Sequence, residues 1–198
     1  MPRTPIVNPA VDRRVRRTRK QLRDALVALV LERGWDAVSV KNVCERADIG
    51  RSTFYVHFAD KEELLLSGFD ELHVTLERER VDAPEPFGFV ASLTAHASDN
   101  VRLFRALIGK PSGQAVQRRF REVVTRLIEA EIGKRGLDDR AVRWVARYVS
   151  GGLVEMLFLW LDRPSSLEPA TLIDLFSGLT RGALRACRGE RAMLIGAP

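Results

Sequence analysis

The chain has 198 residues and a formal net charge of +6, with 45% hydrophobic and 29% charged residues. This composition is typical of a soluble globular protein and excludes a disordered chain. Two cysteines are too few for a disulfide framework or a thiolate zinc site, and the arginine-rich start has no apolar signal segment. The longest nearly apolar stretch, Val149 to Leu161, is too short to span a bilayer. We therefore expect a cytoplasmic protein with no membrane segment, no metal site and no cofactor.

The positive charge is concentrated in the first third of the chain. Residues 1–61 contain 13 Lys and Arg against 7 Asp and Glu, whereas residues 62–198 contain 19 of each. A basic module joined to a neutral one predicts a polyanion-binding head on a body with another task. The alternative interpretation is an exposed basic tail with no partner.

Residues 1–14 contain four Pro or Asn and no periodicity, which predicts a flexible basic arm. From Val15, apolar residues recur at helical spacing until Gly34, which is typical of a left-handed helix end. Ser39 is the expected N-cap of a short second helix. A tight turn at 48–50 then leads to a third helix at 51–57.

Asp60 is the expected N-cap of a fourth helix, which runs from Lys61 to about Arg80. Apolar periodicity between Pro, Gly and Ser breaks predicts further helices at about 87–98, 99–108, 114–134, 138–162 and 169–187. No segment has the pattern of a strand. The sequence thus predicts an all-α fold of about nine helices. Its expected parts are a three-helix head at 15–76, with a helix-turn-helix motif at 39–58, and a helical body at 77–198.

The motif has the geometry that presents a helix to the major groove of DNA, because two short helices are joined by a three-residue turn containing Gly. If Phe54 and Phe58 face inward, Ser52 and Val56 face outward beside Thr53 and Tyr55. An exposed Val suits a thymine methyl group, and Arg51 at the leading end suits guanine O6 and N7. Tyr55, His57 and Lys61 stand where they can hold phosphates.

These residues carry a family resemblance. The segment GWDAVSVKNVCERADIGRSTFYVHFADKEELL resembles the DNA-binding head of the TetR (tetracycline repressor) family of bacterial transcriptional regulators, over roughly residues 15–70. The resemblance implies that Tyr55, His57 and Lys61 contact the DNA backbone or bases, and that Lys41 approaches the groove. The predicted DNA-binding residues are Arg16, Arg17, Ser39, Lys41, Arg51, Ser52, Thr53, Tyr55, Val56, His57 and Lys61.

The resemblance also implies that 15–76 is a helix-turn-helix DNA-binding domain and that 77–198 is a helical ligand-binding and dimerisation domain, which dimerises through its last two helices. Independently, the helix at 138–162 is apolar over more than one face, which is wider than a single core requires. Gly151 and Gly152 in its middle would allow close helix approach. The predicted dimer interface is Gly151, Gly152, Met156, Trp160, Phe176 and Leu179. The alternative is a one-chain core with a Gly-Gly kink.

A small-molecule cavity is expected among the middle helices, because aromatic walls with a few polar groups are typical of such sites. The predicted ligand-binding residues are Phe69, His73, His96, Phe104, Trp144 and Tyr148. The same residue types also suit an ordinary helical core. His73 and His96 are not at metal-ligand spacing, so no metal site is predicted.

An enzyme is not predicted, because the chain has no Gly-rich phosphate loop, nucleophile elbow or metal-ligand run. The sequence favours a homodimeric, sequence-specific transcriptional regulator, a repressor that a small-molecule effector releases from a palindromic operator. The alternative is an architectural protein that binds DNA without sequence preference and has no effector.

The basic cluster before and within the first helix gives a first prediction. Neutralising Arg13, Arg14 and Arg16 together is expected to weaken binding to all DNA and to flatten the slope of log K against log salt, because fewer counterions are released. The slope is measured by titrating DNA at several salt concentrations. An unchanged slope would contradict a role in phosphate binding.

Overall fold

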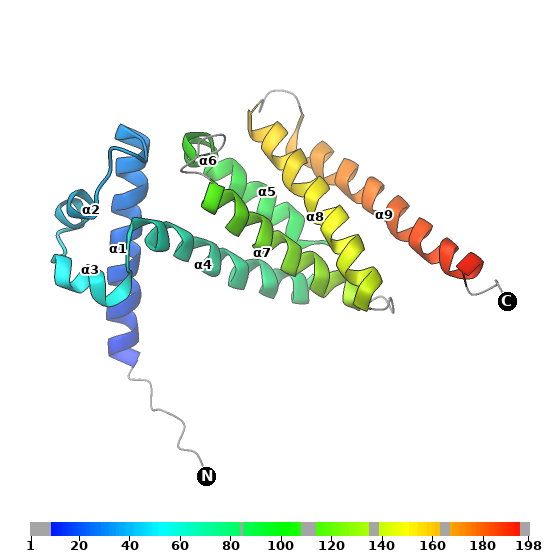
Figure 1. Ribbon diagram of the computed structural model, residues 1–198, viewed down its shortest axis with the longest axis horizontal. Coiled ribbons are helices and arrows are strands. Elements are labelled where there is room, and N and C mark those ends of the chain that lie inside the picture. The colour runs from blue at the N-terminus through cyan, green and yellow to red at the C-terminus, as the bar shows by residue number, and fades with distance from the viewer. Residues whose placement is uncertain (1–8, 84, 108–113, 135–138, 163–166, 195–198) are drawn as a thin grey trace, which may run out of the picture.

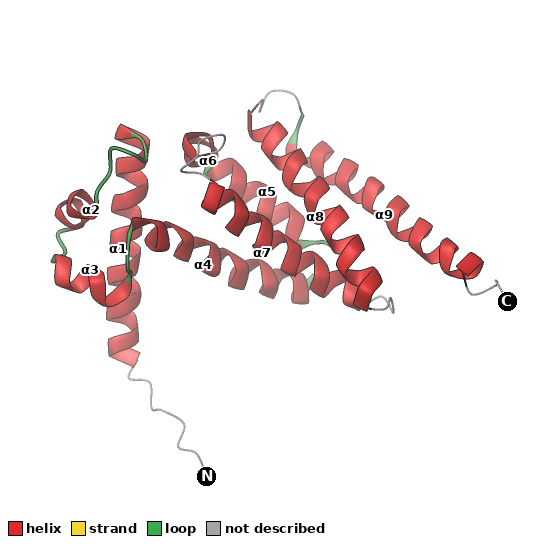
Figure 2. Ribbon diagram, in the orientation of Figure 1, coloured by secondary structure: helices red, strands yellow, loops and turns green. Residues whose placement is uncertain are grey.

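The computed structural model describes residues 9–83, 85–107, 114–134, 139–162 and 167–194. Every regular element in these ranges is a helix (Figure 2). The helices are α1 (Pro9–Arg33), α2 (Val40–Ala47), α3 (Arg51–His57), α4 (Lys61–Asp82), α5 (Phe89–Asp99), α6 (Val101–Leu107), α7 (Gln114–Gly133), α8 (Asp139–Asp162) and α9 (Pro169–Leu194). The prediction of an all-α fold is confirmed.

The helices form a head and a body that share α4 (Figure 1). In the head, α2 and α3 lie on the outer side of α1. Helix α4 leads from the head into the body, where α5 and α7 to α9 pack together and α9 lies at the edge farthest from the head. The strongest packing in the body is between α7 and α8.

Helix α1 begins earlier than predicted. It starts at Pro9, and proline is favoured in the first helical turn because its missing N–H has no partner there anyway. Residues 9–14 are therefore helical, and the predicted flexible arm over 1–14 is wrong for this part; residues 1–8 lie outside the described ranges. At the other end, Gly34 has a φ of +80° and its N–H donates to the Val30 carbonyl, as the predicted helix end requires.

Two clusters of buried side chains hold the fold together. The head cluster includes Leu22 and Leu26 from α1, Phe54 from α3 and Leu64 from α4. The body cluster is larger and includes Leu76 from α4 together with buried residues of α5, α7, α8 and α9. Helix α4 contributes to both clusters, so it crosses the predicted boundary between residues 76 and 77.

A buried arginine fixes the far end of α4 in the body. The Arg80 side chain is 6% exposed, and its Nε and Nη2 donate to the Glu77 carboxylate at 2.8 and 2.6 Å. Its Nη1 lies 3.6 Å from the Glu131 carboxylate of α7. Removing one member of such a buried group would leave an uncompensated charge, which makes this contact a strong constraint on how α4 and α7 pack.

Helix α8 is long and apolar enough to cross a membrane by length and composition, alone among the helices of the described ranges. Half of the relevant stretch is buried inside the protein. That is also the pattern of a helix in the core of a soluble protein, and α8 packs against α7 and α9 on its buried side.

Candidate DNA-binding surface and ligand cavity

Helix α2 begins at a side-chain cap and ends in a tight backbone turn. The Ser39 Oγ accepts from the Asn42 N–H at 3.2 Å, and the Asn42 Oδ1 accepts from the Ser39 N–H at 3.0 Å, so Ser39 is the N-cap of α2 as predicted. Helix α2 ends at Asp48 in the left-handed conformation, with a φ of 53°, which Asp tolerates better than most residues. The chain therefore reverses tightly, and α3 begins at Arg51.

Two aromatic side chains set the rotation of α3. Phe54 is fully buried and Phe58 nearly so, and their ring centroids are 5.9 Å apart. The opposite face is left in solvent, where Tyr55 is 59% and Val56 is 78% exposed. The predicted inward and outward faces of α3 are confirmed.

The remaining predicted residues of α3 complete this outer surface. Arg51, Ser52 and Thr53 are exposed, and His57 is half-buried. Burial raises the pKa of the Cys44 thiol beneath them, while the nearby Arg51 guanidinium acts in the opposite direction. A buried thiol with a raised pKa is unreactive, so Cys44 has a structural role. The groups of this surface that can contact DNA are therefore the side chains of α3.

Lys61 has contacts that the sequence did not predict. Its Nζ donates to the carbonyls of Trp35 at 2.8 Å and Val38 at 2.6 Å, and it lies 4.5 Å from the centroid of the Trp35 ring. Burial lowers the pKa of this ammonium, and the charge of Asp36 opposes that shift. In this structure Lys61 joins the start of α4 to the loop after α1, and is not held out toward a phosphate.

The two predicted residues near the start of α2 are exposed. The Ser39 hydroxyl is used in the cap described above. Lys41 lies 3.8 Å from Glu45 one turn along α2, with both side chains more than 60% exposed. Such an exposed pair contributes little to stability, so a competing phosphate could replace the carboxylate.

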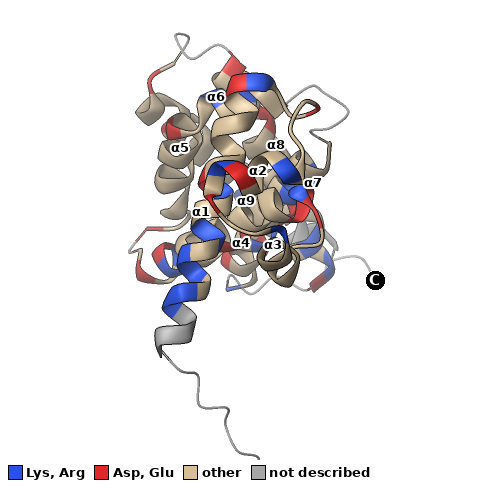
Figure 3. Ribbon diagram, turned by 90° about the vertical axis from the view of Figure 1, so that its left-hand side faces the viewer, with Lys and Arg blue, Asp and Glu red and all other residues tan. Residues whose placement is uncertain are grey.

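The basic residues of α1 lie beside this surface. Figure 3 shows Lys and Arg following one another along the amino-terminal part of α1, next to α3. Arg16 and Arg17 are exposed there. The neighbouring Arg19 guanidinium lies 4.8 Å from the centroid of the Phe58 ring, a cation–π contact that joins α1 to the end of α3. The sequence does not predict this contact, because the periodicity of α1 does not show which side chain meets α3.

Comparison with known proteins identifies the family of the head domain. Residues 22–67 match the family model described as bacterial regulatory proteins, tetR family. Residues 22–67 therefore form a tetR-family domain. The match runs from α1 to the first turns of α4 and includes the whole of the α2–α3 motif.

Relatives with this TetR-family head extend the likeness into the body. The transcriptional repressor KstR of Mycolicibacterium smegmatis is 29% identical over 168 residues, which cover 76% of this chain and 80% of KstR. The uncharacterized transcriptional regulator YdeS of Bacillus subtilis is 25% identical over 64% of this chain and 65% of its own length.

Solved structures of other regulators show the same fold. The fatty acid degradation regulator FadR of Bacillus halodurans has a TM-score of 0.64 at 20% identity, over 85% of this chain and 96% of its own. A complex of SmeT with triclosan has a TM-score of 0.60 at 17% identity, over 84% and 91%.

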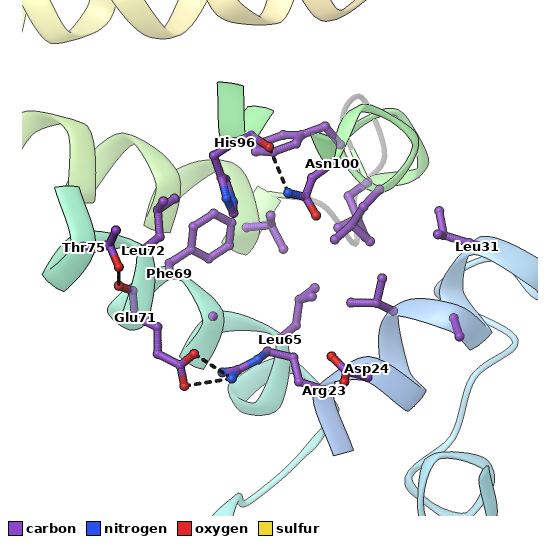
Figure 4. A pocket seen from close by; sticks show the side chains of 17 residues that line it. Arg23, Asp24, Leu31, Leu65, Phe69, Glu71, Leu72, Thr75, His96 and Asn100 are labelled. Atoms are coloured by element: carbon purple, nitrogen blue, oxygen red, sulfur yellow. Dashed lines mark hydrogen bonds and ion pairs between the residues drawn. The ribbon is translucent and has the colours of Figure 1, made fainter. Parts of the chain in front are cut away.

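A cavity of about 650 Å³ lies where the head meets the body (Figure 4). One wall is the stretch of α1 from Arg23 to Leu31, and the others come from α4, α5, α6 and the start of α7. Its lining is mostly apolar, and its volume is in the range of sites for drug-sized ligands.

The predicted ligand-binding residues divide into two groups. Phe69, His96 and Phe104 line the cavity. His73 is half-buried and is not among the lining residues. The prediction is wrong for Trp144 and Tyr148, which lie on the outside of α8 and are 71% and 72% exposed. Their aromatic character suggested a cavity wall, but the rotation of α8 puts them in solvent.

The predicted dimer residues fall into a buried group and a surface group. Trp160 is buried in the body, where its Nε1 donates to the Leu167 carbonyl at 2.8 Å, and Phe176 is buried edge-to-face against Phe87. Both are core residues of one chain and expose little surface that a partner could contact. Met156 is partly buried against the core.

The other predicted dimer residues lie at the surface. Gly152 and Leu179 are exposed and Gly151 is half-buried, and a Cβ added at either glycine would meet no atom within 4 Å.

Lys61 gives a prediction that separates a structural role from DNA contact. Lys61→Met is expected to lower the free energy of unfolding by about 1–3 kcal/mol, because the Val38 carbonyl loses the Lys61 ammonium and the Trp35 carbonyl keeps only the Val38 N–H, at 3.2 Å. The matched variant Arg51→Ala changes an exposed side chain and is expected to stay within about 0.5 kcal/mol of the wild type. Urea unfolding followed by circular dichroism measures both. Equal stability of the two variants would contradict the structural role and favour the predicted phosphate contact.

Proposed function

We propose that this TetR-family regulator is a cytoplasmic homodimer that reads a palindromic operator with α3 and acts as a repressor released by a small-molecule effector. The observation that carries the proposal is the outer face of α3. Phe54 and Phe58 anchor the helix from below, so Arg51, Tyr55 and Val56 are held in solvent on a rigid support.

The chemistry of this face favours base reading. An apolar side chain that is 78% exposed, as Val56 is, gains nothing from water but can contact a thymine methyl group. Arg51, at the first position of α3, is placed to reach a guanine edge, since the leading end of a recognition helix enters the groove first. Ser52, Thr53 and Tyr55 supply hydroxyl groups for phosphates beside it.

The surface of α8 and α9 supports a homodimer. Trp144, Tyr148 and Leu159 are exposed on α8, and Leu175 and Leu179 on α9. On each helix these residues recur at helical spacing, so they form stripes on two neighbouring helices. Large apolar stripes with exposed glycines are typical of a surface that a partner covers, and a two-fold dimer would match a palindromic operator.

Repression and release by an effector are supported by the relatives. KstR is named a transcriptional repressor, and SmeT has been solved as a complex with triclosan. The cavity between head and body offers this chain a place for a small molecule. An effector can shift the regulator away from DNA only if it binds the released state more tightly than the DNA-bound state.

The decisive experiment is selection of bound sequences from a random DNA pool by the purified protein, repeated with Arg51→Ala and Tyr55→Ala. We expect an enriched palindrome. Arg51→Ala should relax one position in each half-site, with a loss of about 1–3 kcal/mol of discrimination, because a bidentate base contact is removed. Tyr55→Ala should weaken binding without changing the preferred sequence, since phosphate contacts carry no sequence information.

The result of the selection separates the two candidate classes. An architectural protein would enrich no sequence, and its two variants would bind more weakly to all DNA alike. That outcome would overturn the proposed regulator.

The dimer is tested by placing a charge in the proposed interface. Leu179→Asp is expected to convert the dimer to a monomer at micromolar concentration, because a carboxylate would be buried without a partner. Light scattering after gel filtration measures the mass. Asp174→Leu, at an exposed position on the same helix, is the control for a general effect of changing α9. A wild-type protein that is already monomeric would contradict the dimer.

A further inference from the structure

The cavity differs from a hollow inside the body in one respect: α1 of the head forms one of its walls. Val27, Ala28 and Leu31 line it from α1, whereas Phe69 and Leu72 line it from α4. On the opposite side stand Leu103, Phe104 and Leu107 of α6. A molecule in this cavity would therefore touch the head and the body at once.

The charged residues around the cavity are already paired. Arg23 donates through Nη2 to both carboxylate oxygens of Glu71, at 2.8 and 2.7 Å (Figure 4). Its Nη1 donates to the Ser67 hydroxyl at 3.2 Å. Asp24 pairs with Lys20 at 2.6 Å. Because these charges neutralise one another, the lining favours a neutral ligand over an ion.

Two polar groups face the apolar interior. Asn100 donates through Nδ2 to the His96 carbonyl at 2.9 Å, which orients its amide so that Oδ1 points into the cavity (Figure 4). The His96 ring stands beside it. Burial lowers the pKa of this imidazole, against the opposing charge of Asp99, so the neutral ring is favoured. A neutral imidazole and an amide oxygen can both accept a hydrogen bond.

From these contacts we propose that the cavity binds a neutral, mostly apolar molecule carrying a hydroxyl or N–H donor, and that this molecule acts as a wedge between α1 and the α5–α6 segment. The donor meets Asn100 and His96, and the apolar part fills the space against Val27, Ala28 and Leu31. The regulatory consequence rests on the proposed function. A ligand that requires a wider gap than the DNA-bound state provides would favour the released state.

The first test uses N-phenyl-1-naphthylamine, a neutral apolar dye with one N–H donor, whose fluorescence rises in an apolar site. We expect saturable binding to the full chain. Ala28→Trp should weaken dye binding about tenfold or more, because the indole occupies the cavity volume from the α1 side. Ala91→Trp, at an exposed position of α5 outside the cavity, is the matched control and should bind like the wild type.

Two further variants keep this test decisive. Leu103→Trp fills the cavity from the opposite wall and replaces Ala28→Trp if that variant fails to fold by circular dichroism. Trp144→Ala changes the exposed stripe of α8, the other apolar surface the dye could choose. Dye binding that survives both cavity variants, or that is lost in Trp144→Ala instead, overturns the proposed site. The same holds if the wild type does not bind the dye.

The second test measures coupling to DNA, with the operator obtained from the random-pool selection. The dye is expected to weaken operator binding by the wild type, and the operator to weaken dye binding by the same factor, because linkage is reciprocal. In Ala28→Trp, whose indole already fills the gap, the dye should cause no further change in operator affinity, whereas Ala91→Trp should respond to the dye like the wild type. Dye binding without any effect on operator affinity overturns the wedge. If no operator is found, the proposed function fails, while the dye measurements still decide the binding site.

Discussion

Helix α4 is the constraint on which the rest of the structure depends, because it belongs to both hydrophobic cores. Leu64 and Leu65 are buried in the head, and Leu72 and Leu76 are buried in the body. A helix of 22 residues is about 33 Å long and does not bend easily over that length. The head cannot turn relative to the body without tilting α4, moving its buried residues in one of the cores, or both.

The two ends of α4 are fixed by different chemistry. At the start, Asp60 accepts from the Glu63 N–H at 2.8 Å, and Lys61 donates to two carbonyls of the loop after α1. At the end, Arg80 is buried between Glu77 and Glu131. The head is held in addition by Leu107 and Val116, which come from the body but are buried in the head core. The cavity lies beside this contact of Leu107 and Val116 with the head. The head and the body are therefore tightly packed on one side of their interface and separated by the cavity on the other.

Much of this fold follows from local sequence. The caps at Ser39 and Asp60, the helix end at Gly34 and the inward pair Phe54 and Phe58 are all set by neighbours within a few residues, and each was predicted correctly. These features depend on backbone hydrogen bonds and on the period of 3.6 residues, which a sequence shows directly.

The contacts between helices could not be predicted in the same way. Nothing near Lys61 in the sequence shows that its ammonium meets the carbonyls of Trp35 and Val38, and nothing near Arg23 indicates Glu71, 48 residues away. Trp144 and Trp160 are both aromatic residues of α8, yet one is exposed and the other is buried. The difference depends on which face of α8 meets α7, and residues elsewhere in the chain set that rotation.

Helix α1 is long enough to connect the cavity directly to the basic residues near its start. The helix runs without a break from Pro9 to Arg33. The residues of α1 that line the cavity and its basic residues therefore belong to one continuous helix and move together. From Val27 to Arg16 is about 16 Å along the axis, at 1.5 Å per residue. A tilt of about 10° pivoting at the cavity would carry Arg16 sideways by about 3 Å, close to the axial rise of about 3.4 Å between successive phosphates of one DNA strand. A tilt of the head by this small angle is thus enough to shift an arginine of α1 relative to the phosphate that it faces.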